Sequence, residues 1–131
     1  MRFTFLILIL FFGLGFAAEA QRLMDGNRRT IGYIENGRVM NATRTTIGHI
    51  DPSRITDASR RTLGYIENGR FMDASRKTVG YIEQSRIMDG SRRTIGYIES
   101  GRVMDGSRRT IGHIENVKNG EVAIFYFFFF Y

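Results

Sequence analysis

Arginine is the residue type whose spacing in this sequence could support chemistry. Arginines recur at a fixed 16-residue interval, and guanidinium groups form paired hydrogen bonds with carboxylates and phosphates. In a ring of repeats they would form one circle, which predicts a rim for an anionic ligand such as phosphate, an anionic glycan or lipopolysaccharide. The alternative is that each arginine pairs with the aspartate of a neighbouring turn and merely solvates the rim. The predicted rim residues are Arg28, Arg44, Arg60, Arg76, Arg92 and Arg108.

The sequence offers few candidate residues for catalysis or for metal binding. The 131 residues contain no cysteine, which excludes a thiolate metal site and a cysteine nucleophile. His49 and His113 take a repeat position that tyrosine holds elsewhere, which favours packing over catalysis. Gly-rich phosphate loops, serine elbows and paired carboxylate motifs do not occur. We therefore predict no catalytic residue, no cofactor and no metal, and a protein that is not an enzyme.

The repeat is the strongest pattern in the sequence. Six units of 16 residues follow one another without insertion from Arg22 to Val117, and each contains a Gly-Tyr-Ile or Gly-His-Ile triplet. The stretch from Asn41 to Thr56 departs most from the consensus, at Asn41, Thr45, Pro52 and Thr56, which marks either a binding edge or drift. Regularity of this kind predicts a repeat architecture.

Each unit reads as a β-hairpin. Thr-Ile-Gly-Tyr-Ile is β-branched and aromatic, and it is too short for a helix. Asn36-Gly37 is a strong two-residue turn signal, which predicts that Glu35 faces Arg38 and that the rest of the hairpin follows in register. Both faces of this hairpin carry apolar side chains, so we expect both to be covered. Pro52 stands where Asn36 stands in its own unit, and its fixed φ predicts a different turn there.

The second connection in each unit is an Asp-Gly-Ser-Arg or Asp-Ala-Ser-Arg turn. Its aspartate can accept hydrogen bonds from backbone N–H groups two residues on. Ala42, Ala58 and Ala74 replace glycine at the second position of this turn, so that position does not require a positive φ.

The phase of the repeats bears on the topology. The units begin with a short strand from Arg22 to Asp25 and end with a long strand from Arg109 to Glu115, and neither has its hairpin partner in sequence. Pairing of these two strands would close a ring of six hairpins. The fold class predicted is all-β, a closed ring of six hairpins. The alternative is an open β-solenoid with the two strands as caps.

The repeated Arg-Thr-Ile-Gly-Tyr-Ile-Glu-Asn-Gly-Arg and the Asp-x-Ser turn resemble the bacterial β-flower repeat proteins. These are small secreted proteins with hairpin petals around an axis, and the Phe-rich C-terminus is also similar to theirs. The resemblance covers residues 21–131 and implies a fold. It carries no catalytic residue with it.

The sequence ends in ten apolar residues, Val122 to Tyr131. They are too few for a transmembrane helix, and they do not alternate like a barrel strand that faces lipid. We expect the segment 118–131 to pack inside the ring as a plug for the domain 21–117. The alternatives are a homo-oligomer formed through residues 122–131, or contact with a membrane.

The start of the sequence predicts where the protein is located. Residues 1–20 have a positive start, an apolar run and Ala18-Glu19-Ala20, as a secretory signal peptide cleaved after Ala20 does. A retained anchor is the alternative. We therefore expect a secreted or periplasmic protein.

The formal net charge is +6, and each unit contributes +1, which looks like an even lattice and not a basic patch. The predicted function is a non-enzymatic binding module, with an anionic envelope polymer as its ligand and no role for nucleic acid. The alternative is a structural or assembly protein that associates through its Phe-rich end.

Overall fold

The computed structural model describes residues 20–131. The predicted signal peptide, residues 1–20, lies outside the described residues except for Ala20. Within residues 20–131, no helix has the length and apolar character needed to cross a membrane.

Twelve strands alternate between a short and a long type. The short strands have four residues each: β1 (Arg22–Asp25), β3 (Arg38–Asn41), β5 (Arg54–Asp57), β7 (Arg70–Asp73), β9 (Arg86–Asp89) and β11 (Arg102–Asp105). The long strands have six: β2 (Thr30–Glu35), β4 (Thr46–Asp51), β6 (Thr62–Glu67), β8 (Thr78–Glu83), β10 (Thr94–Glu99) and β12 (Thr110–Glu115). The chain ends in a helical segment, α2 (Asn119–Ala123) followed by the π-helix η1 (Ile124–Phe129).

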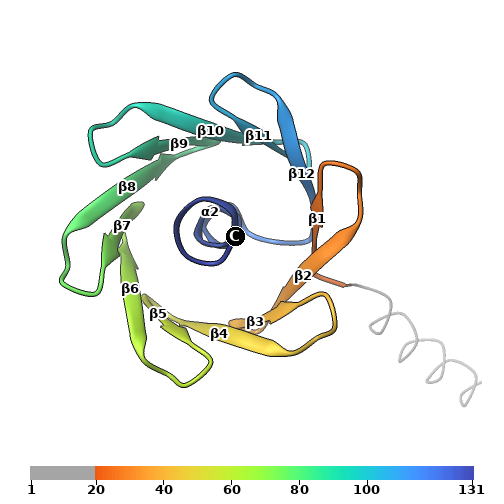
Figure 1. The fold of residues 1–131 in the computed structure, drawn as a ribbon. Helices are drawn as coiled ribbons and strands as arrows, with labels where there is room; N and C mark the ends of the chain where they lie inside the picture. Colours follow the sequence, from red (N-terminus) through yellow and green to blue (C-terminus); the bar gives the residue numbers. More distant parts are fainter. Residues whose placement is uncertain (1–19) are drawn as a thin grey trace, which may run out of the picture.

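The strands form one closed antiparallel ring, as Figure 1 shows. β1 pairs with β12 from Arg22–Glu115 to Asp25–Gly112, so the predicted closure is confirmed and the open solenoid is wrong. At this seam Asn116 and Gln21 take the places of Asn36 and Gly37. Asn116 has φ +58, and its side-chain N–H donates to the Ala20 carbonyl at 3.2 Å, while Gln21 donates to the Asn116 carbonyl at 3.2 Å. The seam is therefore a two-residue turn whose two halves belong to different ends of the repeat domain.

Tight turns join each long strand to the next short strand. In the first hairpin Glu35 faces Arg38, Ile34 faces Val39 and Tyr33 faces Met40, which confirms the predicted register. Both residues of the Asn36-Gly37 turn have positive φ, whereas Pro52 and Ser53 do not. The turn at Pro52 thus differs as predicted, yet the pairing of Asp51 with Arg54 is kept.

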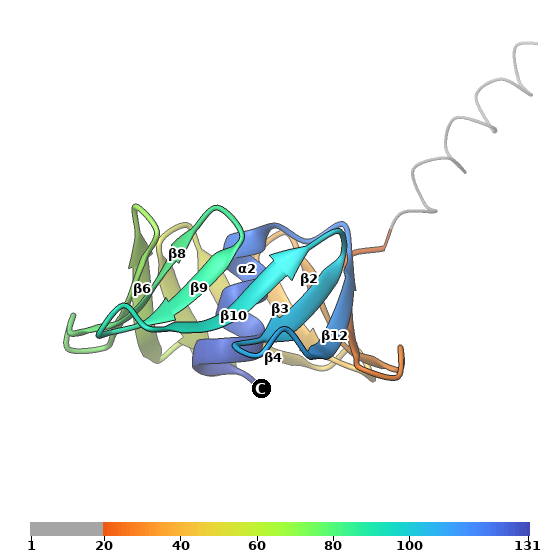
Figure 2. The same cartoon turned by 90° about the horizontal axis from the view of Figure 1, so that it is seen from above.

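Four-residue loops join each short strand to the next long strand, and we call them the petal loops: 26–29, 42–45, 58–61, 74–77, 90–93 and 106–109. They project outward from the ring in Figure 1. Figure 2 shows them flaring at the end of the ring where the C-terminus emerges, while the tight turns lie at the other end. We call these the petal-loop end and the turn end.

An aspartate organises each petal loop, except that Asn41 does so in one. The Asp89 carboxylate accepts hydrogen bonds from the backbone N–H groups of Ser91 and Arg93, both at 2.9 Å. The first loop position, which holds Gly or Ala, has no positive φ, as the alanines indicated, and the residue that does is the arginine at the third position: Arg92 has φ +67. The arginine backbone therefore adopts the left-handed conformation that reverses the chain.

The plug fills the ring. Val122, Ala123, Ile124 and Phe125 are at most 2% exposed, so the prediction that the Phe-rich segment forms the core is confirmed. Six consecutive aromatic side chains each face the triplet glycine of a different petal. In the order Phe125, Tyr126, Phe127, Phe128, Phe129 and Phe130, the glycines are Gly32, Gly112, Gly96, Gly80, Gly64 and Gly48.

This pairing explains the glycines, because a Cβ at Gly48 would come within 2.5 Å of Phe130. It also explains the π-helix. An α-helix turns about 100° per residue, whereas six petals lie about 60° apart around the axis. The wider i→i+5 helix turns less per residue and brings consecutive side chains closer to the petal spacing.

Candidate functional site

The predicted rim arginines lie in the petal loops, and their side chains fold back onto the outer wall of the ring. The Arg44 guanidinium carbon lies 3.9 Å above the centre of the Tyr33 ring, and its nitrogen is 3.2 Å from Glu35. The same arrangement recurs for three more, as the stacks of Arg76 on Tyr65, Arg92 on Tyr81 and Arg108 on Tyr97. Each of these guanidinium groups is thus engaged by an aromatic face and a glutamate of its own chain.

The stacked pairs also cover the outer side of the sheet. Met40 faces Tyr33 across the hairpin and is fully buried, although it points away from the core inside the ring. Met24, Met72, Met88 and Met104 are no more than 2% exposed in the same way. The prediction that both faces of the hairpins are covered is therefore confirmed.

Two of the six rim positions differ. The repeat brings Arg60 towards His49, and across the seam it brings Arg28 towards His113, so neither meets a tyrosine. In the described part of the chain neither arginine forms an ion pair. Beside Arg60, His49 faces Thr56 across the hairpin, and His49 Nδ1 and Thr56 Oγ1 are both buried without a hydrogen-bond partner. The stretch Asn41 to Thr56, which its sequence singled out, thus contains one of the two places where the outer wall is packed differently.

In five of the six petal loops, the residue after the rim arginine is a second cation that projects further into solvent. We call this set the second loop cations: Arg29, Arg61, Lys77, Arg93 and Arg109. The side chains of the four arginines are 77–84% exposed, against 50–57% for Arg44, Arg76, Arg92 and Arg108. They also hold the turn aspartates, at 3.2 Å for Arg93 and Asp89. The aspartate therefore pairs with the second cation of the loop and not with the rim arginine.

Backbone hydrogen bonds and these ion pairs keep the loop carboxylates charged. The N–H of Arg93 lowers the pKa of Asp89 below its usual value, and the N–H of Ser91 and the charge of Arg93 add to the effect. The pKa values of Asp25, Asp57 and Asp105 are lowered by the equivalent groups. The carboxylates are thus committed to the loops and are not free acid–base groups.

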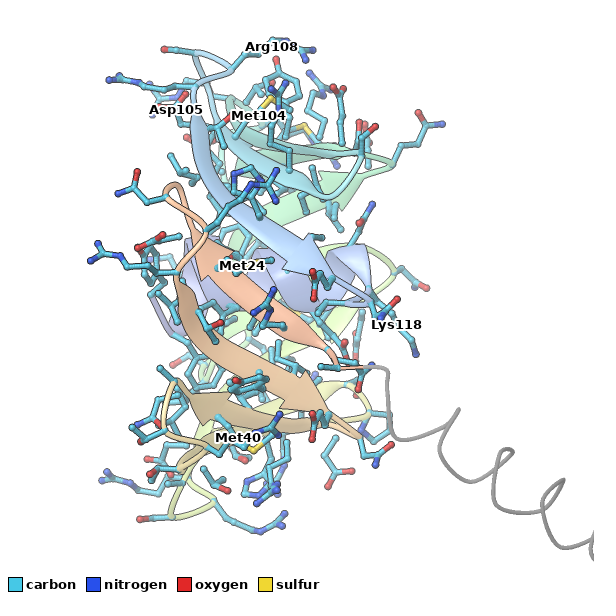
Figure 3. The ribbon with its side chains drawn as sticks, turned by 90° about the vertical axis from the view of Figure 1, so that its right-hand side faces the viewer. Met24, Met40, Met104, Asp105, Arg108 and Lys118 are labelled. Atoms are coloured by element: carbon cyan, nitrogen blue, oxygen red, sulfur yellow. The ribbon has the colours of Figure 1, made fainter. Side chains whose placement is uncertain are left out.

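Charges of both signs are interspersed over the outside of the ring. Each arginine that begins a short strand is matched by an acidic residue that ends a long strand, and Lys118 is matched by Glu121. The five second loop cations equal in number the five acidic residues of the loops, so the surplus of six corresponds to the six rim arginines. Four of these guanidinium groups lie on the outer wall beside the glutamates that end the long strands, and Figure 3 shows Arg108 between Asp105 at the petal-loop end and Lys118 at the turn end. The second loop cations extend further into solvent than their aspartates and form a basic rim at the petal-loop end.

An apolar centre lies inside this basic rim. The side chain before each triplet glycine packs against the core but stays half-buried, as do Phe127 to Phe130. Tyr131 is 68% exposed and is the only large apolar residue in the described chain that is so open. Its ring packs against those of Phe125 and Tyr126 at 6.1 and 5.5 Å. The petal-loop end thus combines aromatic surface with positive charge.

A comparison with protein families now bears on this ring of hairpins around an aromatic plug. The family model described as "5-fold beta-flower protein" matches residues 20–130. The chain belongs to this family. No curated protein and no solved structure is detectably similar to it. This β-flower chain closes with six petals, so the fold number in the family's description does not apply to its own ring.

The β-flower ring offers binding surface more readily than reactive groups. Among residues 20–131, no three histidine, aspartate or glutamate side chains gather into a set that could hold a metal ion. Two features of the petal-loop end were missed from the sequence: the exposure of the second loop cations and that of Tyr131. Part of a signal for the plug was present, since the seven consecutive aromatic residues 125–131 exceed the six repeats by one, and Tyr131 is the residue that faces no glycine.

Proposed function

We propose that this β-flower protein is a non-enzymatic binding module that takes up polyanions at its petal-loop end. The observation that supports this function is the exposure of the second loop cations. The side chains of the four arginines among them are 77–84% exposed and those of their aspartate partners only 16–32%, so cations form the outermost layer at one end of the ring. Equivalent loops present the same cation several times, which suits a ligand with repeated negative charges and raises avidity without strong single contacts. An anionic envelope polymer, such as a glycan or lipopolysaccharide, fits this description of the ligand. A secreted or periplasmic protein, as the sequence predicts, would meet such a polymer.

The proposal places the binding cations in a different layer from the rim arginines. Arg44, Arg76, Arg92 and Arg108 are held by tyrosine and glutamate, and they support the outer wall. The second loop cations extend beyond that wall, and only a short aspartate lies beside each. Exposed ion pairs of this kind contribute little to stability, so the arginine can exchange its aspartate for an external anion at small cost.

Dextran sulfate, a soluble polyanion, is the probe for the test. Arg29, Arg61, Arg93 and Arg109 are replaced together by Gln, and binding is measured by calorimetry at low and at high salt. We expect strong loss of binding in the variant, and loss in the wild type as salt screens the charges. The matched control replaces Arg38, Arg54, Arg70 and Arg86 by Gln, which removes equal charge from residues that hydrogen-bond to threonines of the wall. Equal losses in both variants, or no binding at low salt, would contradict the proposal.

A second candidate function is assembly through residues 122–131, which the exposure of Tyr131 favours. Two copies that met at their petal-loop ends would, however, bring two layers of exposed cations together. Light scattering on a sizing column tests this candidate. A monomer at low and high salt speaks against it, and an oligomer that forms only at high salt supports it, because salt screens the repulsion.

A further inference from the structure

We infer that the petal-loop end docks on an anionic lipid bilayer, with the aromatic centre of the ring in contact with the lipid interface. This inference rests on the proposed function, because it names the polyanion as a membrane surface. Three observations at the same end of the molecule support it: the exposed second loop cations, the exposed aromatic centre and the shape of the ring.

The charge at the petal-loop end indicates which kind of partner covers the aromatic centre. Half-buried apolar side chains also line the turn end, where Ile50, Ile66, Ile82 and Ile114 pack around α2. The acidic and basic residues of that end balance, so nothing there attracts a charged surface. At the petal-loop end, the side chains of the four arginines among the second loop cations are 77–84% exposed and those of their aspartates only 16–32%, so the outermost charges there are positive. This layer opposes a second copy of this chain and favours a surface of negative charge. A bilayer with anionic headgroups has that charge and extends over the whole ring.

The aromatic centre gives a reason for a bilayer in place of a soluble polymer. A polymer needs only the cations, which lie at the tips of the petals. Tyrosine has an apolar ring and a polar hydroxyl, and it prefers the interface between lipid and water. The C-terminal residue Tyr131 lies near the centre of the ring in Figure 1 and is 68% exposed, and Phe127 to Phe130, which precede it, are half-buried.

The shape of the ring lets both parts act together. The petal loops flare outward around the centre at one end, as Figure 2 shows. A flat surface that meets the second loop cations therefore also faces the end of the plug. Each cation near an anionic membrane raises affinity by roughly fivefold, so several equivalent loops can hold the ring without a spanning helix.

Vesicles of phosphatidylcholine, alone or in equal mixture with phosphatidylglycerol, are the probes. The sequence contains no tryptophan, so Tyr131→Trp gives a single reporter at the proposed contact. Asn119→Trp gives the matched reporter at the turn end. With mixed vesicles only, we expect a blue shift in the emission of the Tyr131→Trp variant, and no shift in that of the Asn119→Trp variant. The quadruple Arg→Gln variant should lose vesicle affinity by about tenfold or more, and Tyr131→Ser should weaken it with the loop cations intact.

The outcomes separate this inference from the proposed function. Binding to dextran sulfate without binding to mixed vesicles would overturn the inference and leave the proposed function standing. Vesicle binding with no shift in the Tyr131→Trp variant, or with equal shifts of both reporters, would also overturn it, because the aromatic centre would not be the contact. Failure to bind either probe would end both proposals.

Discussion

The arginine at the third position of each petal loop combines two roles in one residue. Its φ lies between +64 and +69 in all six loops, a region that costs an L-residue roughly 1–2 kcal/mol. Glycine would avoid that cost, yet no loop uses it. The compensation is on the outer wall, where the same arginine stacks on tyrosine and reaches a glutamate in four petals.

This balance predicts the order of two substitutions at Arg92. Arg92→Ala loses the stack on Tyr81 and keeps the strained backbone, whereas Arg92→Gly loses the stack and relieves the strain. We expect the glycine variant to be more stable than the alanine variant by about 1 kcal/mol, measured by chemical denaturation. If alanine were the more stable of the two, the left-handed backbone would not be a source of strain. Arg60 is the matched control site for the same two substitutions. No tyrosine lies beneath it, so only the backbone strain should distinguish its alanine variant from its glycine variant.

The loop aspartates predict a dependence of stability on pH. Backbone N–H groups are the chief cause that lowers the pKa of four loop aspartates in the folded protein: Asp25, Asp57, Asp89 and Asp105. These carboxylates therefore stabilise the fold at pH values above 3.8, the usual pKa of an aspartate. That stabilisation should disappear as the pH falls from about 5 towards 1. A variant with asparagine at all four positions should lose this dependence, since Asn41 already holds its loop by the same hydrogen bonds.

Thermal unfolding of both proteins across this pH range provides the measurement. Burial raises the pKa of Glu121, which acts in the opposite direction, but it is common to both proteins and leaves the difference between them unaffected. A difference that stays constant with pH would contradict the assignment.

At the scale of the elements, the plug and the petals specify one another. Gly96 shows the fit: a Cβ there would lie 2.6 Å from Phe127 Cε1 and 2.8 Å from the Met104 carbonyl. We expect Gly96→Ala to cost about 1–3 kcal/mol, as overpacking does, and Phe127→Leu to recover part of that cost. Chemical denaturation of the two single variants and the double variant gives the coupling. Gly90→Ala is the control, because three loops already carry alanine at that position; additive effects would refute the pairing.

Tyr126 marks the one place where the plug also fastens the ring. It is the only tyrosine among the six radial aromatic residues, and it faces the only seam without a covalent turn. Its hydroxyl donates to the Met24 carbonyl of β1 at 2.5 Å and lies 3.4 Å from the His113 carbonyl of β12. Burial raises the pKa of this hydroxyl, so it stays protonated as a donor.

Tyr126→Phe should therefore weaken the seam more than the rest of the ring. We expect a loss of about 0.5–1.5 kcal/mol in the free energy of unfolding, the usual net value of one hydrogen bond. Hydrogen exchange should increase in β1 and β12 before the other strands. Tyr97→Phe, on the outer wall, is the control that keeps the seam; uniform exchange in both variants would contradict the role of Tyr126.

The sequence predicted the elements where the signal was local. Asn36-Gly37 set the register because a two-residue turn leaves one pairing of the flanking strands, and Pro52 identified the one turn that had to differ. The separation of the loop arginines into two layers was not predictable in this way. Arg92 and Arg93 are neighbours in sequence, but the left-handed backbone of Arg92 directs its side chain onto the wall and leaves that of Arg93 in solvent. The pairing of each triplet glycine with one aromatic residue of 125–130 could not be predicted either, because it depends on the angle between neighbouring petals in the closed ring.

At the scale of the whole molecule, the ring and its plug must agree in number. Six petals supply six glycines, and residues 125–130 supply one aromatic side chain to each, in reverse order around the ring. A ring with fewer petals would have one glycine too few for this plug. The petal count is thus specified twice, by the repeats and by the plug.

This agreement predicts the outcome of removing one petal. Deletion of residues 86–101 removes β9 and β10 in phase with the repeat and leaves Phe127 without its glycine, Gly96. We expect this variant to unfold at a lower temperature and to aggregate, because a large aromatic side chain has no place in the narrower core. Deletion of Phe127 as well restores one aromatic residue per petal, since Tyr126 and Phe128 then face neighbouring petals. The double deletion should be monomeric and more stable than the single one, by thermal unfolding and light scattering. A double deletion that is no more stable than the single deletion would show that the plug does not set the size of the ring.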